Sequence, residues 1–151
     1  MTFRGFTLIE MLITVGIILV VAGLSIPFLF SYSVSGDVTT YANDIERTLR
    51  RAQLQSINGY TGMPWGVYFD EAQNKMVIFQ GSEYVSRDPH YDQEITYSPA
   101  LNVVPTFGAE IYFSVYSGTP SATGTVTVTS TEALFIKTIK INELGIIDAP
   151  N

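Results

Sequence analysis

The stretch RGFTLIEMLITVGIILVVAGLSIPFLF, residues 4–30, decides how this chain is organised. From Met11 to Phe30 it contains no charged side chain. A helix rises about 1.5 Å per residue, so a helix over this run spans roughly 30 Å, the thickness of a bilayer's hydrocarbon core. The run is therefore long enough for a transmembrane helix. One acid, Glu10, stands directly before it.

Three ordinary interpretations compete for this run. A secretory signal peptide has a shorter apolar core and a small-x-small cleavage site, whereas here the run ends in Phe-Leu-Phe with no Ala-x-Ala after it. A buried core helix is disfavoured by the near-uniform hydrophobicity. A single-pass anchor explains the length but not Glu10, because a carboxylate in the apolar zone costs about 2.5–3.5 kcal/mol on insertion scales. Arg4, the only basic residue before the run, weakly favours an N-terminus on the cytoplasmic side.

The residues RGFTLIE, positions 4–10, resemble the class III prepilin signal of type IV pilins and pseudopilins. In that family a prepilin peptidase removes a short basic leader after its glycine and methylates the new N-terminal residue. The resemblance implies a leader over residues 1–5, cleavage between Gly5 and Phe6, and Phe6 as the N-methylated terminus. It also implies a helix kink at Pro27, since a proline inside a helix removes a backbone hydrogen bond.

The same resemblance gives Glu10 a role in subunit assembly. After cleavage Phe6 carries a free positive amine, and Glu10 of a neighbouring subunit pairs with that amine. An unpaired charge is strongly disfavoured in apolar surroundings, so the pair sets the register between stacked helices. The implied partners are the prepilin peptidase, other pilins or pseudopilins in a hetero-oligomeric filament, and an inner-membrane assembly platform.

A second helical pattern follows the polar segment 31–37. From Val38 to Ile57 the apolar residues recur at three- and four-residue steps, which predicts an amphipathic helix. The polar segment is either a helix interruption or the site of a new N-cap at Ser35 or Asp37, and Gly59 is a plausible helix end. We therefore expect a transmembrane or filament-core helix over 6–30 and an amphipathic continuation over 31–59. The Arg50-Arg51 pair lies off the apolar face and is expected in solvent, with partner binding as the alternative.

After Gly62 the pattern changes from helix to strand. PWGVYFD (64–70) and KMVIFQG (75–81) flank EAQN and predict a β-hairpin. Further strands are expected at 94–97, 109–118, 125–131, 133–142 and 146–148, with Lys137 and Lys140 exposed. The predicted fold class is α+β: a long N-terminal helix packed on a mainly antiparallel β-sheet, which forms a β-rich globular pilin domain over 60–151.

The strand region resembles a narrower group within the family. FSVYSGTPSATGTVTVTS (113–130) and KTIKINELGIID (137–148) resemble the C-terminal region of H-type minor pseudopilins of type II secretion and of FimT-like minor pilins. FimT-like members that bind DNA carry basic residues near the C-terminus, where this chain has Glu143 and Asp148. The formal charge of the chain is −6, a field that repels phosphate backbones, so no nucleic-acid partner is expected.

The sequence contains few groups of residues that could form a catalytic or metal-binding site. The chain has no cysteine, and no nucleophile is tied to its single histidine, His90. Residues 118–125 have the glycine spacing of a phosphate loop but lack the lysine that must follow, so a hairpin turn is favoured. Asp88, His90, Asp92 and Glu94 alternate like calcium ligands, but their spacing is not that of an EF-hand, so a solvated acidic loop is favoured. We expect no enzymatic activity, no cofactor and no metal.

The sequence therefore predicts a minor pilin-like subunit, processed by prepilin peptidase and assembled into a pseudopilus or pilus for type II protein secretion. A minor pilin of a type IV pilus or competence system is one alternative. The other is a membrane-anchored periplasmic or surface binding module in which the helix is only a tether. The expected location is the inner membrane, with a single pass and the C-terminal domain in the periplasm or outside.

Overall fold

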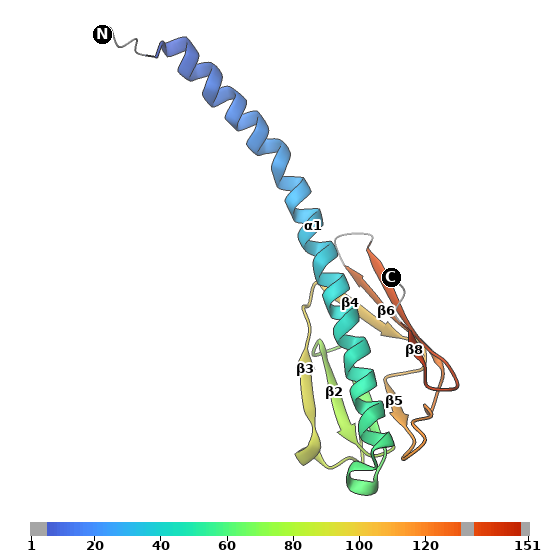
Figure 1. Ribbon diagram of the computed structural model, residues 1–151. Coiled ribbons are helices and arrows are strands. Elements are labelled where there is room, and N and C mark those ends of the chain that lie inside the picture. The colour runs from blue at the N-terminus through green and yellow to red at the C-terminus, as the bar shows by residue number, and fades with distance from the viewer. Residues whose placement is uncertain (1–5, 131–134, 149–151) are drawn as a thin grey trace.

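The computed structural model describes residues 6–130 and 135–148, with the backbone alone described at 24–35 and at position 60. The long helix α1 (Leu8–Ile57) runs along two sheets with its C-terminal half and extends away from them with its N-terminal half (Figure 1). The elements that follow are η1 (Tyr60–Gly62), β1 (Trp65–Asp70), β2 (Lys75–Gln80), η2 (Pro89–Tyr91), β3 (Gln93–Thr96), β4 (Leu101–Pro105), β5 (Glu110–Phe113), β6 (Gly124–Ser130), β7 (Ile136–Ile141) and β8 (Ile147–Asp148).

The polar segment 31–37 belongs to α1, which has neither an interruption nor a new N-cap at Ser35 or Asp37. Thr40 illustrates how a polar residue is accommodated, because its hydroxyl donates to the carbonyl oxygen of Gly36 at 2.9 Å. The helix ends at Ile57, and Gly59 follows with a left-handed φ of 60°. The ring of Tyr116 occupies the space where a Cβ at position 59 would stand, so a glycine is required there. The predicted helix end is confirmed.

The strands form two sheets rather than the single sheet expected from the sequence. Their orders are β3-β2-β1-β5 and β4-β6-β7-β8, and every neighbouring pair is antiparallel. The predicted hairpin is the β1–β2 pair. Strand β4 was not predicted, because its sequence lies in a proline-containing stretch; it is an edge strand, and Pro105 is its last residue, where a missing N–H costs the ladder little.

The strand predicted over 109–118 ends early, at Phe113. The chain then turns, with left-handed φ values of 63° at Tyr116 and 67° at Gly118. The amide of Gly118 donates to the carbonyl oxygen of Ser114 at 2.9 Å, which closes this turn. Aromatic and β-branched residues therefore extended the strand pattern beyond the point where a tight turn takes over.

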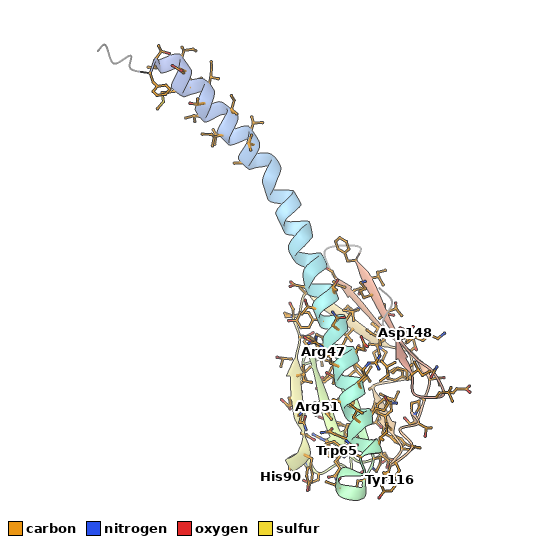
Figure 2. All side chains as sticks on the ribbon, viewed as in Figure 1. Arg47, Arg51, Trp65, His90, Tyr116 and Asp148 are labelled. Atoms are coloured by element: carbon orange, nitrogen blue, oxygen red, sulfur yellow. The ribbon has the colours of Figure 1, made fainter. Side chains whose placement is uncertain are left out.

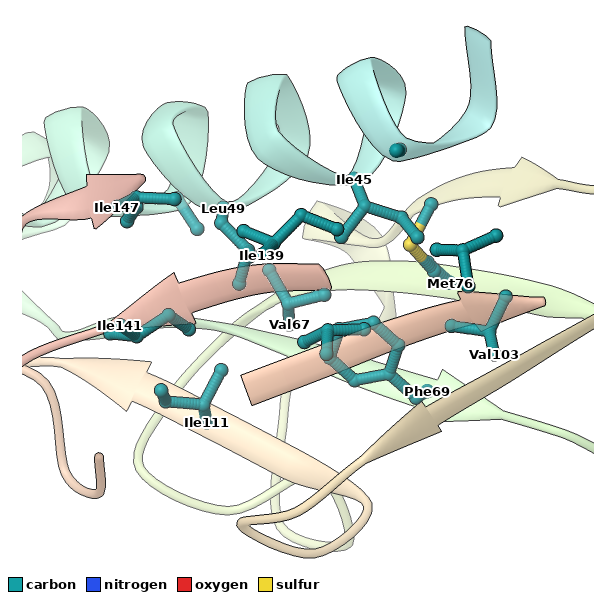
Figure 3. Packing of buried hydrophobic residues seen from close by; sticks show 14 of the residues in the cluster. Ile45, Leu49, Val67, Phe69, Met76, Val103, Ile111, Ile139, Ile141 and Ile147 are labelled. Carbon is teal, nitrogen blue, oxygen red and sulfur yellow. The ribbon is translucent and has the colours of Figure 1, made fainter. Parts of the chain in front are cut away.

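One core joins α1 to both sheets. The buried face of α1 is a stripe at three- and four-residue spacing, formed by Val38, Ala42, Ile45, Leu49 and Ala52. Figure 3 shows Ile45 and Leu49 directed from the helix toward the strands. The strand residues of this core include Val67 of β1 and Ile139 of β7. Since β1 and β7 belong to different sheets, the helix is the element on which both sheets pack. The amphipathic pattern predicted from Val38 onward is confirmed.

The opposite face of the β3-β2-β1-β5 sheet is covered by the segment between β2 and β3. Tyr84 of that segment stacks on Tyr68 with ring centroids 3.9 Å apart, and the guanidinium of Arg87 lies 3.5 Å above the Tyr84 ring. Beneath them the ring of Phe79 fills the space beside Gly66, so a side chain at Gly66 would collide with it. The covering segment explains why β2 is buried on both faces.

Replacing Leu49 with alanine tests the core. Leu49 is fully buried, so Leu49→Ala should lower the free energy of unfolding by about 2–5 kcal/mol through lost burial and a residual cavity. The matched control is Leu54→Ala on the same helix, where the leucine is 57% exposed and the effect should stay within about 0.5 kcal/mol. The measurement is urea unfolding of the full chain in detergent, followed by the fluorescence of Trp65, the single and buried tryptophan. Equal losses in the two variants would contradict the packing described.

Candidate functional site

The first part of α1, as far as position 23, is apolar and uncovered. Every described side chain from position 6 to position 23 is exposed, and the large hydrophobic ones range from 52% at Val15 to 84% at Leu8. Figure 2 shows these side chains projecting around the helix away from the strands. A helix that is apolar on all sides is stable only when lipid or other protein covers it. This part of α1 is therefore a surface that lipid or other protein chains must cover.

Parts of the predicted site fall outside what the structure describes. Gly5 is not among the described residues, and neither is the side chain of Pro27. Cleavage after Gly5, methylation of Phe6 and a kink at Pro27 thus stay predictions. Among the residues that the structure does describe, no helix combines the length and the apolar character that a membrane crossing needs.

Glu10 lies in the first turn of α1, and its backbone is held by the residue that begins the helix. Thr7 is the N-cap, with extended backbone angles, and its hydroxyl accepts a hydrogen bond from the Glu10 N–H at 3.3 Å. The Thr-x-x-Glu pattern is that of a capping box, and an acid in the first turn is favoured by the helix dipole. The Glu10 carboxylate has no hydrogen-bond or ion-pair partner in the described part of the chain. The capping bond uses only the backbone N–H of Glu10, so the local reason for an acid here is the helix dipole.

The polar side chains of Arg50, Gln53 and Ser56, on successive turns of α1, hold the helix to the sheets through hydrogen bonds. Arg50 Nη2 donates to the Ile147 carbonyl oxygen at 2.6 Å, while Arg50 Nε binds Glu46 at 2.8 Å. Further along, the hydroxyl of Ser56 accepts from the Trp65 N–H at 2.8 Å. Because Arg50 binds β8 and Ser56 binds β1, these bonds reach both sheets.

Gln53 lies between those two residues on α1. Its Nε2 atom donates to the carbonyl oxygens of Gly118 at 3.0 Å and Gly145 at 2.8 Å, so it connects two loops that are far apart in the sequence. The bonds of Gln53 were not predicted from the sequence. Arg50 is exposed, as predicted, but its guanidinium also binds Glu46 and the Ile147 carbonyl oxygen. Arg50 and Gln53 are three residues apart, at the border between the apolar and polar faces of the helix. Long polar side chains at such a border can reach the backbone of neighbouring elements, and this position could have indicated their role.

Gln53→Ala should destabilise the domain. The substitution leaves two partly buried carbonyl oxygens without their donor, at a cost of about 1–3 kcal/mol. Gln73→Ala, on the exposed β1–β2 turn, is the matched control and should change stability by less than about 0.5 kcal/mol. Urea unfolding of both full-length variants measures the difference, and a Gln53→Ala protein as stable as its control would show that these two bonds contribute nothing.

The acidic residues between 88 and 94 do not converge on a common point. Asp88 caps η2 by accepting from the His90 N–H at 3.0 Å, and Asp92 binds Arg87 Nε at 2.8 and 3.0 Å. Glu94 binds Lys75 Nζ at 2.9 Å, and this hydrogen bond raises the pKa of Lys75. Across the described residues no three potential metal-ligating side chains gather in one group. The calcium alternative thus finds no ligand set, because the carboxylates bind separate partners.

The glycine-spaced stretch 118–125 runs from the connection after β5 into the start of β6. These two strands belong to different sheets, so the predicted hairpin turn is wrong and the stretch instead crosses from one sheet to the other. A strand follows it, whereas a phosphate loop leads into a helix. Lys140 is exposed as expected, and Lys137 is only partly exposed. The three threonines on the outer face of β6 are likewise partly exposed.

Comparison with known proteins fits this geometry. The prokaryotic N-terminal methylation motif matches residues 1–26, the segment that includes the uncovered beginning of α1. A methylation motif at the head of a long helix that packs on antiparallel sheets is the arrangement of pilin-like proteins, so the predicted resemblance to type IV pilins and pseudopilins is confirmed. No curated protein matches the chain by sequence.

Among solved structures, the chain is similar to the minor pseudopilin EpsH from the type 2 secretion system of Vibrio cholerae. The TM-score is 0.59 at 14% identity, and the match covers 76% of this chain and 96% of that chain. A crystal structure of the same pseudopilin gives 0.59 at 13% identity, covering 77% of this chain and 94% of that one. At these identities the likeness shows a shared fold, and it confirms the predicted α+β class.

Proposed function

We propose that this chain is a minor pseudopilin of a type II secretion system, processed at its N-terminus and assembled into a pseudopilus. The observation that carries the proposal is the methylation motif at the head of an uncovered apolar helix that is continuous with the sheet domain. The fold shared with EpsH, a minor pseudopilin, supports the same assignment. In this role the chain is a structural subunit and a peptidase substrate rather than an enzyme.

The geometry serves such a role because one apolar surface suits two environments. Lipid covers the exposed half of α1 before assembly, and the corresponding helices of neighbouring subunits cover it afterwards. Moving between these environments changes little apolar exposure, so pairing of charges can decide when and where a subunit joins. The proposed location is the inner membrane, crossed once, with the sheets in the periplasm. The proposed partners are prepilin peptidase, sibling pseudopilins and the assembly platform.

The first test is the mature N-terminus. Mass spectrometry of the protein purified from cells with the complete secretion machinery should find a chain that begins with N-methylated Phe6. Gly5→Ala should reduce this processing strongly, since the peptidase of this family cuts after glycine. A mature chain that still begins at Met1 would favour the alternative of a membrane-anchored binding module and contradict the proposal.

The second test separates the two reasons for Glu10. Glu10→Gln keeps a side chain that can complete the capping box but removes the charge, whereas Glu10→Ala removes both. If the carboxylate pairs with the amine of Phe6 on a neighbouring subunit, both variants are processed normally and both fail to enter the filament. The readout is the amount of each variant in sheared pseudopili relative to the membrane fraction. Normal incorporation of Glu10→Gln would show that helix capping alone accounts for the residue.

A further inference from the structure

Two exposed arginines on the outer face of α1, Arg47 and Arg51, form only one weak ion pair within the described structure, between Arg47 and Asp44. The Arg47 side chain is 81% exposed, and its closest carboxylate, Asp44, lies at 3.9 Å. Arg51, one turn further on and also exposed, forms no hydrogen bond or ion pair with any described residue. The neighbouring Arg50, by contrast, is held by Glu46 and by a backbone carbonyl. An otherwise acidic chain thus presents two adjacent, available guanidinium groups.

These arginines border an open hollow between the helix and the edge strand β3. The hollow measures about 310 Å³ and is lined by Asp44, Arg47, Thr48, Arg51 and Ile95. Figure 2 shows Arg47 and Arg51 on the part of α1 that runs along the strands. The Thr48 hydroxyl already donates to the Asp44 carbonyl oxygen at 2.6 Å, so the available donors are the guanidinium groups. Two forked donors beside the apolar side chain of Ile95 suit a carboxylate on a short aliphatic stem, as in aspartate or glutamate.

Position along the helix indicates that the acid belongs to a protein. Arg47 lies 17 residues beyond Phe30, the last residue of the apolar run, which is about 26 Å along a helix at 1.5 Å per residue. That distance is roughly three times the Debye length of about 8 Å at physiological salt, so lipid phosphates at the membrane surface are out of reach. Two arginines in a chain of net charge −6 are also too few to hold a nucleic acid.

We propose that Arg47 and Arg51 form a docking surface for a carboxylate-bearing face of an adjacent pilin-like subunit. The inference rests on the proposed function, because the filament supplies the neighbour. The two arginines lie on the same helix as the uncovered residues 6–23, so one elongated neighbour can contact both. Charge pairing above the apolar contacts then selects which subunit docks there, because a neighbour without the matching acids leaves two arginines unpaired.

Site-directed cross-linking in cells with the complete secretion machinery tests this surface. The chain has no cysteine, so Asn43→Cys, one turn before Arg47 and exposed, gives a single attachment point for a thiol-linked photo-cross-linker. We expect an adduct with another pilin-like subunit, identified by mass spectrometry. Adding Arg47→Glu and Arg51→Glu should lower the adduct yield at least about fivefold. Lys140→Glu, an exposed charge reversal on β7, is the matched control and should leave the yield unchanged.

The outcomes separate this inference from the proposed function. Thermal unfolding checks that the double variant is folded, and Arg47→Gln with Arg51→Gln replaces it if it is not. An unchanged adduct yield in a folded variant with methylated Phe6 would overturn the docking surface and leave the pseudopilin assignment intact. An adduct with lipid or nucleic acid would overturn it as well. An unprocessed wild-type chain that forms no adduct would overturn both.

Discussion

Burial of one face of α1 between two sheets is the constraint on which the rest of the structure depends. The stripe from Val38 to Ala52 contacts inward-facing residues of both sheets, so neither sheet completes its core without the helix. Apolar burial stabilises such a core by about 25 cal/mol per Å² removed from water. The hydrogen bonds from Arg50, Gln53 and Ser56 contribute less energy but fix the angle and rotation of the helix. The exposed half of α1 inherits its direction from this packing.

The chain thus divides a single helix between two kinds of surface. The C-terminal half satisfies its apolar stripe within the chain, whereas the N-terminal half leaves apolar side chains on every side uncovered. Thr7 and Glu10 lie at the start of the uncovered part of α1, where a capping residue and an acid in the first turn are both favourable. Sequence resemblance alone had attributed the glutamate to assembly. The structure adds a local reason, because the carboxylate lies in the first turn of the helix, where the dipole favours a negative charge.

Much of this fold is readable from the sequence, and the failures have physical causes. The amphipathic half of α1 and strands β6 to β8 follow from periodicity, because each has one face in the core. The β1–β2 hairpin follows instead from two apolar runs that flank a short polar loop. The division into two sheets was not predicted, since strand partners far apart in the chain leave no local signal. Nor were the bonds of Gln53, whose acceptors Gly118 and Gly145 are brought together only by the folded chain. The acidic residues from 88 to 94 alternate along the sequence as metal ligands can. In the structure their carboxylates instead bind separate partners, such as Arg87 and Lys75.

The continuity of α1 has a mechanical consequence. A helix of 50 residues is about 75 Å long, and the polar segment 31–37 does not break its course. The sheets are clamped to one end of this helix, so in the proposed filament a push or a twist on the other end would be passed along the helix to them. In the proposed pseudopilus, growth of the fibre would therefore advance and rotate the sheet-bearing domain of this subunit together with its base.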